Sequence, residues 1–188
     1  MKDRLIIIGG SAGSLDVLLT LLPGLSTSFP VPIVIILHRK ASADNSLTQL
    51  LASKTRINVQ EAEEKEQIKE NCIYIAPADY HLLIEKNKTF SLDFSEKVNY
   101  SRPSIDVSFQ TAAETYGPAL TAILLSGANH DGTEGLREVK RFGGTTIVQD
   151  PDSAEVNFMP KAAIEADLAD NILGPTEMLM YLNQLAIK

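Results

Sequence analysis

The chain has 188 residues, with 24 acidic side chains against 17 Lys and Arg, so its formal net charge is −7. This acidic balance argues against a nucleic-acid partner, which would need clustered cationic side chains to contact phosphates. The apolar runs are too short for a signal peptide or a membrane-spanning helix, so we expect no membrane insertion. The length suits one domain, and we predict a single catalytic domain over residues 1–188.

The chain contains one cysteine, Cys72, which cannot form an internal disulfide. It lies in the apolar run CIYIAP, which is typical of a buried strand. Both features favour a reducing compartment, and we predict a cytoplasmic protein.

Apolar runs of strand length alternate with stretches of helical length. These runs are continuous rather than alternating, which is typical of parallel strands covered on both faces. We therefore predict an α/β fold: a doubly wound, mostly parallel, Rossmann-like sheet flanked by helices. The predicted strands are Leu5–Ile8, Ile33–Leu37, Cys72–Ala76, Leu120–Leu125, Thr145–Val148 and Asn171–Leu173. The predicted helices are Ser14–Leu22, Ser46–Ser53, Ile105–Tyr116, Thr133–Phe142, Pro160–Glu165 and Thr176–Ile187, with Ser104 as the N-cap of the third.

Two segments depart from this rhythm. Residues 81–85 and 89–93 are short apolar runs joined by Lys-Asn-Lys, which predicts a β-hairpin insertion near 81–93. Residues 61–70, EAEEKEQIKE, are strongly charged, and we interpret them as a solvated connector rather than a docking site.

Residues 9–13 read Gly-Gly-Ser-Ala-Gly, directly after the first strand and before the first helix. This satisfies G-x-S-x-G in the strand–turn–helix context that exposes a nucleophilic serine, here Ser11. The same motif is equally consistent with a βα turn whose glycines bind a phosphate at the helix N-terminus. Neither the dinucleotide nor the P-loop fingerprint is met.

A nucleophilic serine needs a base, and the chain has three histidines. His38 directly follows the second strand, and the carboxyl ends of parallel strands share one edge of the sheet, so His38 should lie near Ser11. A lone histidine after a strand is more often structural, but this placement favours a general base. His81 opens the hairpin and is interpreted as structural or peripheral. His130 is a rival base, but as a direct neighbour of Asp131 in sequence it should point elsewhere.

A carboxylate should complete the site by accepting the imidazole N–H. Asp131 follows the strand at 120–125 and so should reach the same edge; the alternative is that it only caps the next helix. Asp150 is a rival acid, although Asp150-Pro151-Asp152 is more typical of a turn. Histidine and cysteine lack metal-ligand spacing, and we expect neither metal nor cofactor.

Taken together, these motifs resemble the catalytic domain of chemotaxis protein-glutamate methylesterases, the CheB type, from about residue 4 to residue 182. The matching segments are IIIGGSAGS, the strand ending in His38, YIAPADYH at 74–81, SRPSIDVSF at 101–109, ILLSGANHDGTEG at 123–135 and VQDPDSAEVNFMPKAA at 148–163. Several dispersed motifs in one order are far more specific than the serine motif alone.

The resemblance implies that Ser11 is the nucleophile, His38 the general base and Asp131 the residue that orients it. It also implies an oxyanion hole and cleft built from Ala12, Gly13, Ala128 and Asn129. The implied substrates are glutamate γ-methyl esters, and glutamine side-chain amides, on the helical cytoplasmic domain of methyl-accepting receptors. Family members usually carry an amino-terminal receiver domain. We expect none in this chain: either the protein stands alone, in which case a receiver domain could act in trans, or the sequence is part of a longer protein.

Some residues depart from the family pattern. Arg39-Lys40 replace the usual Met-Pro after the histidine, Phe158 replaces a glycine before Met159-Pro160, and Ala128 replaces a methionine. We expect Arg39, Phe158 and Met159 to contact the substrate. The departures also motivate an alternative, a non-catalytic signalling module that docks through a diverged cleft, and the glycine-rich turn leaves phosphate binding as a third hypothesis.

Overall fold

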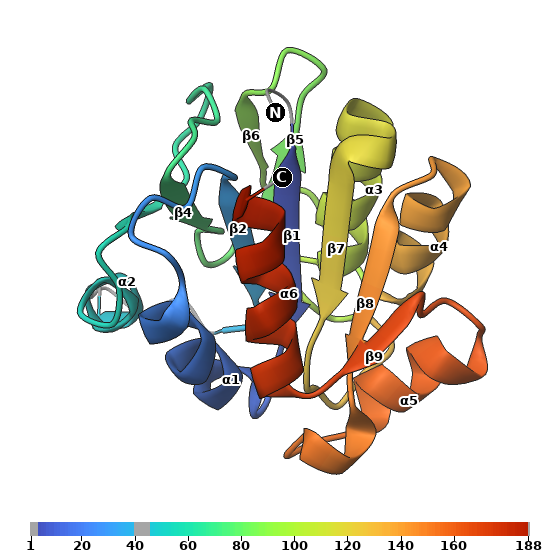
Figure 1. The fold of residues 1–188 in the computed structure, drawn as a ribbon. Coiled ribbons are helices and arrows are strands. Elements are labelled where there is room, and N and C mark those ends of the chain that lie inside the picture. The colour runs from blue at the N-terminus through green and yellow to red at the C-terminus, as the bar shows by residue number, and fades with distance from the viewer. Residues whose placement is uncertain (1–3, 40–45, 188) are drawn as a thin grey trace.

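The structure, a computed structural model, describes residues 4–39 and 46–187, so Lys40 lies outside the described residues (Figure 1). Its centre is a seven-stranded sheet in which all paired strands are parallel, which confirms the predicted fold class. In spatial order the strands are β3 (Asn58–Glu61), β4 (Cys72–Ile75), β2 (Ile33–Leu37), β1 (Leu5–Gly10), β7 (Leu120–Leu124), β8 (Thr145–Gln149) and β9 (Asn171–Leu173).

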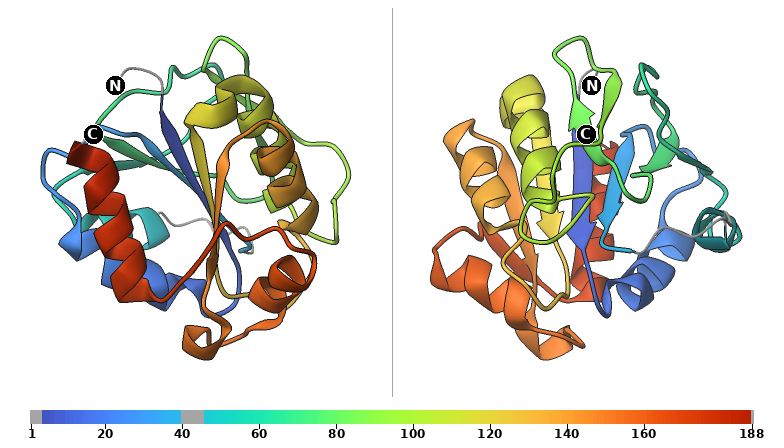
Figure 2. Two further views of the ribbon diagram at one scale, coloured as in Figure 1. Left: turned by 45° about the vertical axis from the view of Figure 1, so that its right-hand side comes forward. Right: turned by 180° about the vertical axis from the view of Figure 1, so that it is seen from behind.

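Helices cover both faces of the sheet (Figure 2). One face carries α1 (Ser14–Leu21), α2 (Ser46–Ala52) and α6 (Pro175–Ile187). The other carries α3 (Ile105–Tyr116), α4 (Thr133–Arg141), α5 (Phe158–Glu165) and the predicted hairpin, formed by β5 (His81–Ile84) and β6 (Phe90–Asp93). Three short 3₁₀ helices complete the described elements: η1 (Leu22–Gly24), η2 (Gly117–Ala119) and η3 (Pro151–Ser153). Within the described residues, no helix combines the length and apolarity needed to cross a bilayer.

The core explains why the strand sequences are continuously apolar. Along β1, Leu5 and Ile7 belong to the cluster under α3 and α4, whereas Ile6 and Ile8 belong to the cluster under α1 and α6. Side chains of a strand alternate between faces, and here both faces are covered, so every position must be apolar.

The sequence prediction missed one strand. β3, with the sequence NVQE, forms an edge of the sheet and pairs only with β4. Its side chains are half-buried or exposed, so it lacks the continuous apolar run by which the other strands were recognised. Residues 61–70 after it are mostly exposed, although Ala62 is buried. Helix α5 also begins earlier than predicted, at Phe158, because a proline such as Pro160 is tolerated in the first turn.

The strand order places the candidate site. From β1 the chain passes to β2, then to the edge strand β3 and back inward to β4, and it later crosses to β7 on the other side of β1. The order therefore reverses between β1 and β7, and in such sheets ligands bind at the carboxyl ends of the strands beside this point. Ser11, His38 and Asp131 all follow strands that end there.

We predict that close packing of α3 on α4 depends on Gly135. A Cβ atom at this position would lie 2.6 Å from Phe109 Cβ and 3.0 Å from Asp106 Cα. Gly135→Ala should therefore lower the free energy of unfolding by about 1–3 kcal/mol, measured by urea denaturation. The matched control is Gly174→Ala, whose Cβ would lie 3.5 Å from the flexible Glu177 side chain and should be tolerated. Equal effects of the two substitutions would contradict this account.

Candidate active site

Ser11 lies in a tight turn between β1 and α1. Its N–H donates to the Ser126 carbonyl at 2.9 Å, and its own carbonyl accepts hydrogen bonds from the N–H and Oγ of Ser14. Gly13 then takes a left-handed conformation, with φ of 78°, and caps α1. These contacts fix the backbone of Ser11 at the carboxyl end of β1, as the G-x-S-x-G pattern predicts.

His38 lies beside Ser11. The last paired residues of the neighbouring strands β1 and β2 are Gly10 and Leu37, and the N–H of His38 donates to the Gly10 carbonyl at 3.1 Å. Residues two apart on a strand share a face, so His38 lies on the same face as Ile36, which is the face covered by α3. The sequence prediction that Ser11 and His38 share one edge of the sheet is confirmed.

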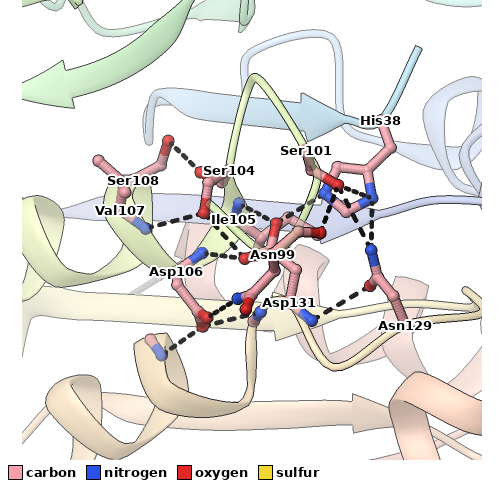
Figure 3. A network of polar contacts seen from close by, with 12 residues as sticks. His38, Asn99, Ser101, Ser104, Ile105, Asp106, Val107, Ser108, Asn129 and Asp131 are labelled. Atoms are coloured by element: carbon pink, nitrogen blue, oxygen red, sulfur yellow. Dashed lines mark hydrogen bonds and ion pairs between the residues drawn. The ribbon is translucent and has the colours of Figure 1, made fainter. Parts of the chain in front are cut away.

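The Asp131 carboxylate accepts four hydrogen bonds, and it is fully buried (Figure 3). Oδ2 accepts from the Ile105 N–H at 2.7 Å and contacts His38 Nε2 at 2.7 Å. Oδ1 accepts from Ser104 Oγ at 2.8 Å and from the Asp106 N–H at 3.0 Å. Three of these donors belong to the first turn of α3 and its N-cap, so Asp131 caps α3 rather than the helix that follows it in sequence.

The same contacts set the charge of Asp131. Burial raises its pKa, but the hydrogen bonds from His38 and from the N–H groups of Asp106 and Ile105 outweigh burial, and the net pKa is lowered. The N-terminus of α3 also carries a partial positive charge. Asp131 is therefore an ionised acceptor at neutral pH, held where it can orient an imidazole.

Asp106 forms the reciprocal contact. Its Oδ1 accepts from the N–H groups of Gly132 and Gly135, at 2.8 and 2.7 Å, and so caps α4. Its Oδ2 accepts from Asn99 Nδ2 at 2.8 Å. Burial and the nearby charge of Asp131 raise the pKa of Asp106 to about 6. Because this pKa lies above that of an unfolded aspartate, its contribution to stability is present at low pH and is lost as the pH rises through about 6.

With Nε2 directed at Asp131, the other ring nitrogen of His38 faces the cleft. Nδ1 lies 3.5 Å from Ser101 Oγ and 3.4 Å from Asn129 Nδ2, which are both long for hydrogen bonds. Within the described residues, no hydrogen bond joins the Ser11 hydroxyl to this nitrogen. Donation of the Nε2 proton to Asp131 leaves Nδ1 as the ring atom that can accept a proton.

The other two histidines have different partners. His81 is buried: its Nδ1 accepts from the Ser104 N–H at 3.1 Å, and its Nε2 lies 2.9 Å from the Glu96 carbonyl. This agrees with the structural role predicted for it. His130 packs edge-on against the Phe158 ring, with ring centroids 4.7 Å apart. Asp150, the rival acid, accepts from the Asp152 N–H in a turn, as its sequence predicts.

Several backbone N–H groups close to Ser11 in the sequence or in the adjoining loop have no acceptor among the described residues. Those of Ala12 and Gly13, at the start of α1, and of Ala128 and Asn129 donate to no acceptor within residues 4–39 and 46–187. By contrast, the N–H of neighbouring Gly127 is bound to the Val156 carbonyl. Free N–H groups on two loops that meet at the serine are suited to stabilise an oxyanion.

The residues expected to contact a substrate lie in different environments. Phe158 is 45% exposed at the start of α5. Arg39 is paired with Glu61. Met159 is fully buried, and its sulfur lies so close to Gly127 that a Cβ atom there would be 1.9 Å away. Met159 therefore packs against the loop at 127–129.

Ser101, Ser104 and Asp106 were not identified as site residues from the sequence, although all three lie in the segment SRPSIDVSF. The one signal that could have identified them is the resemblance of this segment to the family, since the segment contains no catalytic motif. Within the part of the chain that the structure describes, no group of three or more His, Cys, Asp or Glu side chains is placed to hold a metal ion.

A serine in a strand–helix turn, an imidazole beside it and a buried carboxylate that orients the imidazole are together typical of α/β serine hydrolases. Residues 6–182 match the family described as CheB methylesterase. The chain belongs to this family.

Relatives and a solved structure agree with this assignment. A Leptospira interrogans protein named putative protein-glutamate methylesterase/protein-glutamine glutaminase is 49% identical, and the match covers 93% of this chain and 90% of that protein. A Thermotoga maritima protein-glutamate methylesterase/protein-glutamine glutaminase is 38% identical over 92% of this chain and 51% of the relative. The crystal structure of the Thermotoga maritima CheB methylesterase catalytic domain superposes with a TM-score of 0.93, at 37% identity, and covers 98% of this chain and all of that one.

We predict that Asp131→Asn destabilises the protein, because an amide would direct an N–H group at donors such as His38 Nε2 and the Ile105 N–H. The free energy of unfolding should fall by about 1–3 kcal/mol, measured by urea denaturation at pH 7. Asp150→Asn is the matched control, since that carboxylate also follows a strand but receives only a local turn hydrogen bond. A control as destabilising as Asp131→Asn would refute the central role of this network.

Proposed function

We propose that the chain hydrolyses glutamate γ-methyl esters, and deamidates glutamine side chains, on methyl-accepting chemotaxis receptors. The observation that carries the proposal is the 2.7 Å contact between His38 Nε2 and buried Asp131, directly beside Ser11. The names of the relatives support the substrate class, and the arrangement of Ser11, His38 and Asp131 supports hydrolysis by a serine nucleophile.

In the proposed mechanism, the Ser11 hydroxyl oxygen attacks the ester carbonyl carbon while His38 Nδ1 takes the hydroxyl proton. The two contacts that Nδ1 now makes are long, so the Ser11 hydroxyl can replace them at little cost. Collapse of the tetrahedral intermediate expels methoxide, which takes the proton from the imidazolium and leaves as methanol. Water, activated by the same nitrogen, then hydrolyses the acyl-enzyme to glutamate. Asp131 stays ionised and stabilises the imidazolium.

The oxyanion of the intermediate is assigned to the N–H groups of Ala12 and Ala128, with Gly13 and Asn129 as the neighbouring cleft residues. The support is that these groups lack protein acceptors within the described residues. A donor of this type contributes about 3 kcal/mol to transition-state stabilisation. Arg39, Phe158 and Met159 are the proposed substrate contacts. Arg39 lines the groove beside His38, Phe158 is 45% exposed, and Met159 packs against Gly127.

The proposed setting follows from the same chemistry. The substrate is the helical cytoplasmic domain of the receptor, and the protein acts in the cytoplasm, where its buried thiol at Cys72 stays reduced. We propose residues 1–188 as one catalytic domain, since the described residues share a single main sheet. A receiver domain is the proposed regulator, because family members usually carry one, and it is proposed to act in trans on this chain.

A second candidate is a non-catalytic docking module on the same fold. The observation that favours it is the position of His38 Nδ1, which contacts Ser101 and Asn129 rather than Ser11. In this alternative the cleft would bind the receptor without turning it over.

We predict that Ser11→Ala lowers methanol release from methylated receptor by about 10³-fold or more, because no other group can form the acyl-enzyme. The measurement is radiolabelled methanol released under saturating substrate. Ser28→Ala, an exposed serine outside the site, is the control and should match the parent. If the parent neither releases methanol nor is labelled at Ser11 by an organophosphate, the docking module replaces the enzyme.

A further inference from the structure

A groove of about 420 Å³ opens beside the imidazole of His38. It is lined by the cationic side chains of Arg39, Lys97 and Arg102, and Asp79 is the one carboxylate among its described lining residues. The protein as a whole has a net charge of −7, so this local excess of positive charge stands out. A groove of this kind favours an anionic occupant.

Only one of these cations is available to a partner. Arg39 is paired with Glu61, and Arg102 is paired with Asp79 at 2.9 Å. Lys97 is exposed and forms no ion pair with any residue that the structure describes. Its ammonium group is therefore free to pair with a carboxylate that enters the groove.

Tyr100, at the edge of the same groove, is 98% exposed. It lies in a two-residue turn closed by hydrogen bonds in both directions between Val98 and Ser101. Both turn residues have positive φ, 50° at Asn99 and 61° at Tyr100, a conformation that costs energy for residues other than glycine. The turn is held nonetheless, because Asn99 donates to the half-buried Asp106 carboxylate at 2.8 Å.

Two further aromatic side chains extend this surface. Phe94 is 61% exposed, and its ring stacks on the Arg102 guanidinium at 3.9 Å. Tyr80 is 39% exposed, with its ring centroid 5.5 Å from that of Phe94. Exposed aromatic rings clustered beside a charged groove are typical of the residues that dominate binding at protein interfaces. We call Tyr80, Phe94 and Tyr100 the aromatic rim.

We propose that Lys97 and the aromatic rim form the docking surface for the acidic face of the substrate helix. The occupant is a receptor helix that carries a carboxylate three or four residues from the esterified glutamate. Such neighbours lie on one helix face with Cβ atoms about 5–6 Å apart. Because Lys97 lines the same groove as His38, the proposed pose pairs that carboxylate with Lys97 while the ester lies at Ser11. The aromatic rim then covers the apolar flank of the helix. This inference rests on the proposed function.

The test compares two substrates for each variant: a methylated receptor fragment and p-nitrophenyl acetate, a small neutral ester that needs no docking. The readout is the ratio of the two kcat/KM values. Lys97→Glu and Tyr100→Ala should each lower this ratio about tenfold or more, chiefly through the KM for receptor. Lys97→Arg, which keeps the positive charge, should retain most of the parental ratio. Added salt should lower the ratio of the parent protein more than the ratio of Lys97→Glu.

The matched controls are Lys86→Glu and Met180→Ala. Lys86 is an exposed lysine in the turn between β5 and β6, which lies at the opposite end of the sheet from the candidate site (Figure 1). Met180 is 59% exposed on α6. Both controls should leave the ratio unchanged.

The outcomes separate this inference from the proposed function. A parent that hydrolyses receptor through Ser11, with Lys97→Glu and Tyr100→Ala showing the parental ratio, overturns the docking surface and leaves the function intact. A parent inactive on receptor overturns both. If Tyr100→Ala instead dissociates a dimer in sedimentation and leaves the ratio unchanged, the rim binds a second copy of the chain, and the docking proposal also fails.

Discussion

The site depends on the burial of one negative charge, that of the Asp131 carboxylate. An isolated buried carboxylate would be protonated or would cost several kcal/mol, but here the N-cap and first turn of α3 supply three donors and His38 supplies the fourth. Asp106, in the first turn of α3, in turn caps α4. Two helices thus exchange carboxylate caps, and the candidate general base is held by the same hydrogen bonds that fix how these helices pack on the sheet.

This exchange also connects the catalytic groups to the proposed docking surface. Asp106 binds Asn99, and the turn that contains Asn99 presents Tyr100 to solvent and places Ser101 against His38 Nδ1. The backbone of this turn is strained at two positions, and strain of this kind persists only where the surrounding structure enforces it. A single hydrogen-bonded network therefore positions both the proposed base and the proposed contact with the receptor helix.

Much of this arrangement could be predicted from the sequence, because a parallel sheet brings the residues after its strands to one edge. Continuous apolar runs identified every strand of the main sheet except β3, whose half-polar edge sequence carries no such signal. The partner of Asp131 could not be predicted, since by local rules it would cap the next helix, whereas in the fold it caps α3 from a distance. The ring nitrogen of His38 that faces Asp131 is likewise set by tertiary geometry alone.

The most direct test of the account is the protonation state of the His38 ring, measured by ¹⁵N NMR of the imidazole in the neutral form. The account predicts a proton on Nε2, with the downfield shift of a strong hydrogen bond to a carboxylate, and a bare Nδ1. Asp131→Asn should remove the downfield signal. A neutral ring with its proton on Nδ1, or an Nε2 proton signal that is indifferent to Asp131→Asn, would contradict the account.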